Sequence, residues 1–374
     1  MKLGVDLSVM DELQSLNPQY TYQGKPIEPF SFFAKHSGVS MVRLRLWNDP
    51  YDEQGRPYGG GTNDLPCFIR LAKKAIANGM EVMLDFHYSD FWVDPARQLC
   101  PKAWRNKTFD EVVQLLGDYT RDTLLAIKKE GIDLAAIQVG NEITHGAVWP
   151  YGETLNAFDP KIGGGFEGLC ALLKAGCAAC KEVYPNAKTL IHLEHSGSHE
   201  MQYGYFMLLE KFGVDYDLIG EAYYPFWHGG FPDFEDNISK ISKKFKKPIW
   251  VVEAGYEFAG CPNPDYVDEK ADASIPTDIL GNVPFPHTKQ GQADYLAKLL
   301  EVCKKLGVEM VFYWEPTWIY LPNNGWADEA GQLYCGLKPE PPVNDWDRQC
   351  LFGFDGSANP GVDVFTQKFV DSIK

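Results

Sequence analysis

Two glutamates end apolar runs of this sequence, and their positions suggest paired carboxylate chemistry. Glu142 closes the run Ala135–Glu142, and Glu253 closes Pro248–Glu253. Packing explains neither residue well, because burying an unpaired charge is costly. Cleavage of a glycosidic bond uses such a pair: one carboxyl group protonates the leaving oxygen, and the other attacks the anomeric carbon or activates water. Either glutamate alone is equally well explained as a solvated residue at the start of a loop, but two at equivalent strand ends favour a catalytic pair.

The elements that would position these glutamates are eight short apolar runs. They are Leu3–Ser8, Val42–Trp47, Glu81–Tyr88, Ala135–Glu142, Lys188–Glu194, Leu218–Tyr224, Pro248–Gly255 and Glu309–Pro316. Their near-continuous hydrophobicity is typical of parallel strands that are covered on both faces. We therefore expect eight parallel strands, with Glu142 and Glu253 at the ends of the fourth and the seventh.

Amphipathic segments lie between the runs and predict helices. They are Asp64–Asn78, Thr108–Lys129, Phe166–Val183, Glu200–Phe212, Phe234–Phe245, Thr288–Leu306 and Val362–Ile373. The alternation predicts the α/β class, with one (β/α)8 TIM barrel over residues 1–374. A doubly wound sheet is the alternative, but no G-x-G-x-x-G follows the first run.

The lengths of the connections indicate where a site would lie. The long ones follow the C-terminal ends of strands: Asn48–Asn63, Ser89–Lys107, Ile143–Gly165, Glu257–Lys289 and Thr317–Val362. Connections on the opposite side, such as Asn78–Met80, are short. Barrel enzymes build their sites on the C-terminal face, so we expect the working surface there.

Polar residues near the two glutamates complete a candidate sugar site. Asn141 precedes Glu142, and its amide is placed to bind a ring hydroxyl. Arg45 ends the second strand, where a buried charge requires a carboxylate partner, and positioning the attacking glutamate would supply one. Tyr223 and Tyr224 end the sixth strand, and one of their hydroxyls is expected to orient the glutamate on the seventh.

Three further residues at strand ends have strong structural alternatives. His87 ends the third strand, where a lone histidine is more often a satisfied structural residue than an acid or base. Trp314 ends the eighth strand and Trp318 follows it. Either indole is suited to stacking on a sugar ring, but core packing is a serious competing explanation.

Metal chemistry is the rival class, and its best candidate is the segment Glu194–His199. Its H-x-x-x-H lies among Gly and Ser, whereas zinc sites favour His pairs on one helix face or C-x-x-C pairs. The C-x-x-C of Cys177 and Cys180 lies within a predicted helix and lacks a second ligand pair. Because no G-x-S-x-G occurs, a serine hydrolase has no support. We expect neither a metal ion nor a cofactor.

The composition limits the partners. The chain carries 35 basic and 51 acidic residues, a net charge of −16, which argues against nucleic acid and anionic membranes as partners and is compatible with a neutral sugar. The cysteines number nine, without paired spacing, which predicts reduced thiols. Met1 runs directly into the first strand without a signal peptide, so the chain as written is expected to be a cytoplasmic monomer, or a secreted one if a leader was removed.

Several sequence blocks closely resemble family 53 of the glycoside hydrolases. They are Arg43–Pro50, Tyr58–Asn63, Leu84–Pro95, Pro101–Trp104, Gln138–Glu142, Trp149–Pro150, Tyr223–Trp227, Val251–Glu253, Gly291–Gln292, Tyr313–Pro316 and Leu351–Gly356. They occur in the family's order and span nearly the whole chain.

The resemblance implies the activity of that family, the endo-β-1,4-galactanases. These are retaining (β/α)8 barrels that act on the β-1,4-galactan of arabinogalactan side chains. It implies that Glu142 is the general acid/base and Glu253 the nucleophile. The matching blocks also contain substrate-binding candidates, which are Asp49, Asp90, Trp92 and Trp149. A related barrel hydrolase acting on mannan or glucan, and a silent carbohydrate-binding barrel, are the alternatives.

Overall fold

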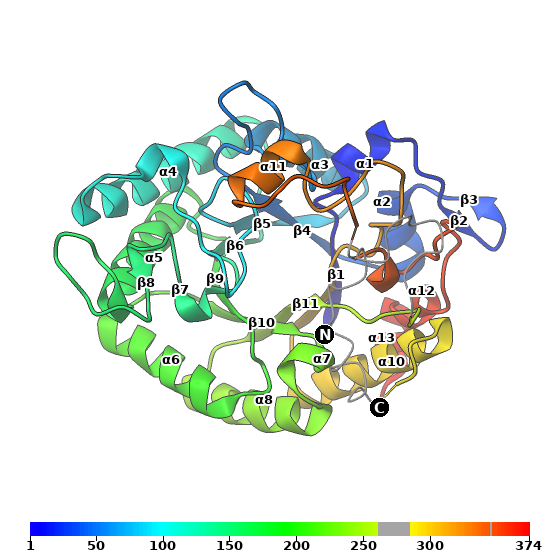
Figure 1. Cartoon of the computed structure of the whole chain (residues 1–374). Coiled ribbons are helices and arrows are strands. Elements are labelled where there is room, and N and C mark those ends of the chain that lie inside the picture. The colour runs from blue at the N-terminus through cyan, green and yellow to red at the C-terminus, as the bar shows by residue number, and fades with distance from the viewer. Residues whose placement is uncertain (261–284, 345) are drawn as a thin grey trace.

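Eight parallel strands form a closed barrel in the computed structural model of the chain (Figure 1), which describes residues 1–260, 285–344 and 346–374. Around the barrel the strands follow the order β1-β12-β11-β10-β9-β6-β5-β4. Their bounds are β1 Lys2–Asp6, β4 Met41–Leu46, β5 Glu81–Phe86, β6 Ala136–Val139, β9 Lys188–Leu193, β10 Leu218–Tyr223, β11 Ile249–Ala254 and β12 Met310–Tyr313. The predicted (β/α)8 fold is confirmed.

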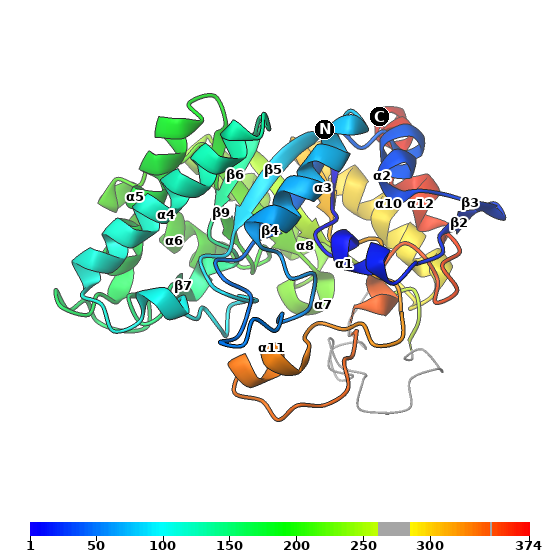
Figure 2. The ribbon, with the colours of Figure 1, turned by 90° about the horizontal axis from the view of Figure 1, so that it is seen from above.

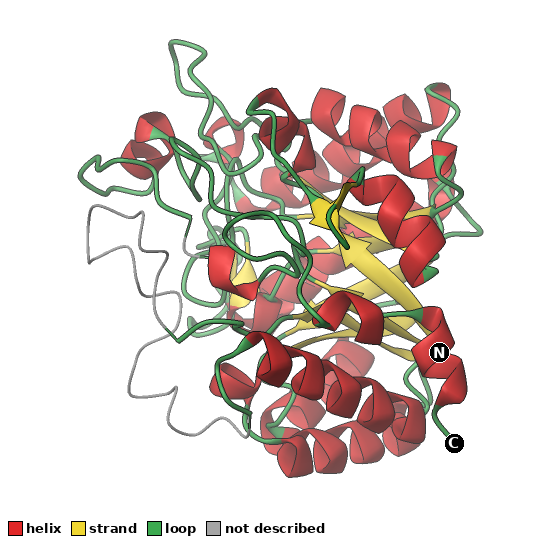
Figure 3. Ribbon diagram, turned by 90° about the vertical axis from the view of Figure 1, so that its right-hand side faces the viewer, coloured by secondary structure: helices red, strands yellow, loops and turns green. Residues whose placement is uncertain are grey.

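Helices surround the barrel, while the loops gather at one end of it (Figure 3). The main helices are α3 Leu65–Ala77, α4 Phe109–Lys129, α5 Gly165–Val183, α6 His199–Phe212, α8 Phe231–Phe245 and α10 Lys289–Leu306. Short helices are α1 Met10–Ser15, α2 Pro29–Phe32, α7 Pro225–His228, α11 Glu329–Tyr334, α12 Gly361–Val364 and α13 Gln367–Ser372. The hairpins β2–β3 (Thr21–Tyr22, Lys25–Pro26) and β7–β8 (Gly146–Ala147, Gly152–Glu153) lie outside the barrel sheet.

The C-terminal segment differs from the expected single helix over Val362–Ile373. It forms two short helices, α12 and α13, separated at Phe365 and Thr366. Thr366 has extended backbone angles, and its side chain accepts a hydrogen bond from the Phe369 amide. This is an N-cap, and it starts a new helix instead of continuing the previous one.

The barrel interior is apolar at one end and charged at the other. The apolar end holds a cluster that includes Met41, Met83, Trp250 and Phe312. Side chains in a strand alternate between two faces, so the residues that follow Met41 on the inside of β4 are Arg43 and Arg45. By the same alternation Met83 is followed on the inside of β5 by Asp85 and His87. The strands thus carry a charged layer above an apolar floor.

An irregularity in β11 turns Glu253 toward the barrel interior. Val252 belongs to the interior apolar cluster, so a regular strand would point the next residue outward. The register with β10 pairs Glu221 with Val251 and then Ala222 with Glu253, which passes over Val252. A bulge of this kind re-aims a side chain. As a result Val252 and Glu253 both face inward.

The fourth barrel strand ends earlier than the run Ala135–Glu142 suggested. β6 stops at Val139, and Gly140 (φ 89°) begins a turn. Glu142 lies in that turn with a φ of 49°, in the left-handed region that side chains other than glycine rarely adopt. Tertiary contacts therefore hold Glu142 in place, since the strand ladder does not reach it.

The cysteines of the described ranges form no disulfide. Cys335 is partly exposed and the other seven are buried. Cys261 and most of the predicted loop Glu257–Lys289 lie outside the described residues. Among the helices of the described ranges, none combines the length and apolar character that crossing a membrane requires.

Candidate active site

Long loops lie on the side of the barrel away from both termini (Figure 2). Residues of these loops and of the strand ends line a large cavity. Its volume is about 760 Å³, and both Glu142 and Glu253 line it. The other lining residues are His87, Trp92, Val93, Asp94, Pro95, Ala96, Arg97, Asn141, Glu194, His195, Tyr224, Trp227, His228, Trp314, Trp318, Trp326, Leu337 and Trp346. The cavity thus brings together the two glutamates that the sequence placed on separate strands.

Glu253 is held by a cation and a hydroxyl group. Its Oε1 lies 2.9 Å from Arg43 Nη2, and Tyr224 donates its hydroxyl to Oε2 at 3.2 Å. Burial and the charges of Asp85 and Asp6 raise the pKa of Glu253 to about 7, although the charge of Arg43 and the Tyr224 hydroxyl lower it. A carboxylate fixed on both oxygens has a defined direction, which suits a nucleophile.

Arg43 is the centre of the charged layer. Its guanidinium lies 3.0 Å from Asp6 Oδ2 and 2.8 Å from Asp85 Oδ2, in addition to Glu253. It also donates to Gln138 Oε1 at 3.2 Å and to Asn141 Oδ1 at 2.8 Å. The planar fork of arginine allows several acceptors to be held at once, which a point charge cannot do.

The expectation that Arg45 would position the attacking glutamate was wrong. Arg45 pairs with Glu315 at 2.6 Å and donates to the Gly60 carbonyl at 3.2 Å. Its guanidinium lies 4.2 Å from the centre of the Trp92 ring. Arg43 and Arg45 are two residues apart and share a face of β4, so alternation alone does not distinguish them.

Within residues 1–260, 285–344 and 346–374, no cation is paired with the Glu142 carboxyl group. Its backbone N–H lies 3.4 Å from His192 Nδ1. Removal from water raises the pKa of Glu142 well above its ordinary value, and the negative charges of Glu253, Glu194 and Asp94 raise it further. When one proton is shared within the pair, it therefore resides on Glu142, because Arg43 stabilises the charged form of Glu253.

Asn141 lines the cavity and is fixed by buried neighbours. Its Oδ1 receives hydrogen bonds from Arg43 and from Gln138 Nε2 (3.1 Å), and it lies 2.9 Å from His192 Nδ1. Its Nδ2 donates to the Val93 carbonyl at 3.2 Å. One amide hydrogen is left over, so a sugar hydroxyl remains a suitable acceptor.

His87 lines the cavity as a structural residue. The Trp47 indole donates to its Nδ1 at 3.1 Å, so Nε2 carries the proton and donates to Asp85 Oδ2 at 3.1 Å. Burial lowers the pKa of His87, so the ring is neutral. Both ring nitrogens are used, and only the ring surface is offered to a ligand.

Tryptophans form the walls of the cavity. Trp92 stacks on Trp318 with ring centres 6.0 Å apart, and Trp314 contacts Trp346 edge-on at 4.6 Å. Sequence reasoning did not single out Trp227, Trp326 or Trp346, which also line the cavity. Trp227 is 42% exposed. It belongs to the block Tyr223–Trp227 that resembles family 53, and this was the sequence signal that could have identified it.

Besides Arg45, four of the predicted substrate contacts do not line the cavity. Asp49 is exposed and pairs with Lys102 at 3.2 Å. Asp90 accepts from the Lys102 backbone N–H at 2.7 Å. Trp149 and Tyr223 donate to backbone carbonyls, those of His145 (3.0 Å) and Gly229 (3.2 Å). Tyr224 is thus the one of the two tyrosines that contacts Glu253.

Among the described residues, no three His, Cys, Asp or Glu side chains are grouped so that they could hold a metal ion. The segment Glu194–His199 does not act as one unit. Glu194 and His195 line the cavity, whereas His199 lies against Tyr203 at the start of α6.

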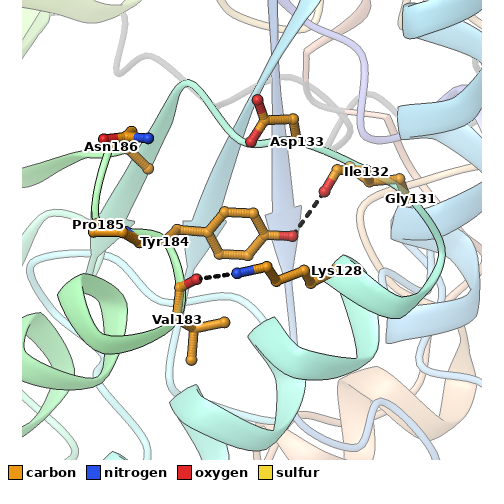
Figure 4. Close-up of a pocket in the computed structure, with 9 residues that line it drawn as sticks. Lys128, Gly131, Ile132, Asp133, Val183, Tyr184, Pro185 and Asn186 are labelled. Atoms are coloured by element: carbon orange, nitrogen blue, oxygen red, sulfur yellow. Dashed lines mark hydrogen bonds between the residues drawn. The ribbon is translucent and has the colours of Figure 1, made fainter.

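A smaller pocket of about 320 Å³ lies where α4 connects to β6 and α5 connects to β9 (Figure 4). Tyr184 donates to the Ile132 carbonyl at 2.7 Å, and Lys128 to the Val183 carbonyl at 2.8 Å. These contacts join two connections at the N-terminal ends of strands, so they have a structural purpose.

The sequence pattern of Glycosyl hydrolase family 53 matches residues 2–365. The chain belongs to this family. It is therefore a glycoside hydrolase, which confirms the family and the enzyme class that the sequence blocks suggested.

Named relatives of family 53 cover most of the chain. An "Endo-beta-1,4-galactanase" of Bacillus subtilis (strain 168) is 33% identical and covers 97% of this chain and 84% of its own length. An "Arabinogalactan endo-beta-1,4-galactanase" of Cellvibrio japonicus (strain Ueda107) is 33% identical, with 85% and 80% covered. The solved "Ignisphaera aggregans GH53 catalytic domain" has a TM-score of 0.85 and 34% identity, covering 97% of this chain and 94% of that one.

Proposed function

We propose that the chain is a retaining, endo-acting β-1,4-galactanase that cleaves galactan or its oligosaccharides. The printed names of the Bacillus and Cellvibrio relatives support the substrate and the endo action. The net charge of −16 fits an uncharged sugar chain. The observation that carries the mechanism is the unequal environment of the two carboxyl groups in one cavity.

In the proposed first step Glu142 protonates the leaving oxygen while Glu253 attacks the anomeric carbon. The glycosidic C–O bond breaks, a bond from carbon to Glu253 forms, and Glu142 becomes a carboxylate. Arg43 and Tyr224 keep Glu253 ionised and aimed before attack. Glu142 has no paired cation in the described part of the chain and retains the proton that this step requires.

In the proposed second step Glu142 acts as a base. Esterification has neutralised Glu253, so its repulsion no longer raises the pKa of Glu142, which can then be a carboxylate that accepts a proton from water. That water attacks the anomeric carbon and releases Glu253. Asn141, which precedes Glu142 and contacts the same Arg43 nitrogen as Glu253, is placed to bind a hydroxyl beside the reacting carbon.

Incubation with linear β-1,4-galactan and short β-1,4-galacto-oligosaccharides tests the proposal. We expect a rapid fall in polymer length with a mixture of short products, and NMR of the first products should show retained β configuration. Preferential cleavage of mannan or glucan would show that one of these polymers, and not galactan, is the substrate. A first product with inverted configuration would contradict the covalent step. Binding to galactan without cleavage would identify a silent carbohydrate-binding barrel.

The residues assigned to this reaction come from one chain, and we propose that the enzyme acts as a monomer. Light scattering at the concentrations used for kinetics tests this, since a dimer would double the measured mass.

A further inference from the structure

Glu194 is a third carboxyl group in the cavity, beyond the proposed pair. It directly follows β9, is 2% exposed, and lines the cavity together with Glu142 and Glu253. Neither of its carboxyl oxygens makes a hydrogen bond of standard geometry with the described residues, although the Thr144 hydroxyl and the backbone N–H groups of Thr144 and Glu194 lie close enough to lower its pKa. Its closest basic group is His195, with Nε2 at 3.7 Å from Oε1.

Other acidic residues in the barrel interior are matched by cations. Asp6, Asp85 and Glu253 contact Arg43, and Glu315 contacts Arg45. Glu194 lacks such a partner, and an unpaired buried carboxylate is costly. A cost of this kind in a site that already holds two carboxyl groups calls for a functional explanation.

Glu142 and Glu194 follow the ends of two neighbouring strands. β6 and β9 are paired, with Ala136 opposite Lys188 and Gln138 opposite Leu190. Past the ends of these strands, both glutamates line the same cavity. The contact between the Glu142 backbone N–H and His192 Nδ1 shows that the chain stays close to β9 after β6 ends.

The backbone of Glu194 is also fixed. Gln202 of α6 donates to its carbonyl at 3.1 Å and with the same nitrogen to Glu221 at 2.6 Å. The side-chain oxygens of Glu194 expose almost no surface, so a sugar hydroxyl does not reach them without movement of the side chain. Glu194 is therefore suited to act on a neighbouring group through its charge.

We propose that Glu194 is a positioning residue that keeps the proton on Glu142 until the leaving oxygen takes it. The inference rests on the proposed roles of Glu142 and Glu253. A negative charge buried beside an acid disfavours ionisation of that acid, and the effect is strong where water does not screen it. In agreement, the charge of Glu194 raises the pKa of Glu142, and burial raises the pKa of Glu194 itself to about 7.

Other charged and titratable groups also act on these two carboxyls. Those acting on Glu142 are Arg43 of β4, Asp94 of the loop after β5, His192 of β9, Tyr224 after β10 and Glu253 of β11. Those near Glu194 are His195, Glu221 and Tyr205. Asp94 accepts a hydrogen bond from the Ala96 N–H at 2.7 Å, which stabilises its charge and distinguishes it from Glu194.

The pH dependence of kcat/KM in E194Q tests the proposal. The alkaline limb reports loss of the proton from the acid, so we expect it to move to lower pH by about one unit on galacto-oligosaccharides. With an aryl glycoside whose leaving group needs no protonation, the alkaline limb should be the same in E194Q and wild type. The matched control is E257Q, because Glu257 is a buried carboxyl that pairs with Arg348 and does not line the cavity, and its profile should match that of the wild type.

An alkaline limb of E194Q that coincides with that of the wild type on galacto-oligosaccharides would overturn the proposal. So would an equal shift in E257Q, because it would indicate a general effect of removing a buried acid. If E194Q does not fold, 13C-NMR titration of Glu142 in E253Q provides the second measurement. We expect two steps in that titration, one following ionisation of Glu194, and a single step would refute the coupling.

The same measurements separate this inference from the proposed function. If neither galactan nor its oligosaccharides are cleaved, the function fails, whereas the NMR titration still reports whether the two carboxyls are coupled. If cleavage requires Glu142 and Glu253 but its pH profile is the same in E194Q and the wild type, only the role proposed for Glu194 is refuted.

Discussion

Arg43 Nη2 lies 2.9 Å from Glu253 Oε1, and the same nitrogen donates to Asn141 Oδ1 at 2.8 Å. One guanidinium nitrogen thus joins the proposed nucleophile to the residue that precedes the proposed acid. Because Arg43 also contacts Asp6 and Asp85, the position of the reactive pair depends on strands from different parts of the chain.

Replacing Arg43 by lysine should impair the nucleophile. An ammonium group cannot hold Asp6, Asp85 and Glu253 together, so we expect kcat/KM in R43K to fall about 100-fold or more. Weaker stabilisation of the Glu253 carboxylate raises its pKa, so the acidic limb of the pH profile should move to higher pH. R45K is the matched control, because Arg45 pairs with Glu315, and a smaller loss is expected. Equal losses in both variants would show that Arg43 has no special role.

Removing the acid should affect substrates according to their leaving groups. In E142Q we expect kcat/KM on galacto-oligosaccharides to fall about 10²–10⁴-fold. With an aryl glycoside that leaves without protonation, the first step should survive and the covalent intermediate should accumulate, giving a burst of aryl product. Equal losses on both substrates would argue against Glu142 as the acid.

The adjacent tyrosines provide a paired test of nucleophile orientation. Tyr224 donates to Glu253, and a hydrogen bond to a charged group contributes about 1.5–3 kcal/mol. Y224F should therefore lose roughly 10–100-fold in kcat/KM, with the acidic limb moved to higher pH. Y223F is the control, since the Tyr223 hydroxyl contacts the Gly229 carbonyl away from the cavity. The expectation fails if Y223F loses as much activity as Y224F.

Ionisation of the buried Glu221 carboxyl should lower the free energy of unfolding as the pH rises. Burial raises its pKa in the folded chain well above the ordinary 4.5, although the hydrogen bond from Gln202 lowers it. Folding then takes up a proton above pH 4.5, so this contribution to stability is present below that pH and is lost progressively as the pH rises toward the folded-state pKa.

E221Q removes the titration and keeps an oxygen for Gln202. We expect its Tm at pH 8 to exceed that of the wild type by about 2 °C or more, and the difference to vanish near pH 4. Thermal unfolding followed by circular dichroism across this pH range measures it. E301Q, at an exposed position of α10, should show no pH-dependent difference. A constant difference at all pH values would contradict the explanation.

The sequence by itself determined the barrel and the two glutamates. Eight apolar runs alternating with amphipathic segments are a local signal, and local patterns are sufficient to indicate strands, helices and the loop-bearing face. Charged residues at strand ends stand out because burial without a partner is costly. Recognising Glu142 and Glu253 as a pair therefore required only residue types and spacing, whereas the role of each was implied by the family resemblance.

The tertiary structure decided which partners these residues have. Alternation along β4 gives Arg43 and Arg45 the same face, and only their depth in the barrel assigns Glu253 to one and Glu315 to the other. The irregularity that turns Glu253 inward arises from pairing between β10 and β11, which no local pattern encodes. Depth and register depend on contacts between residues far apart in the chain, so they emerge only when the barrel closes.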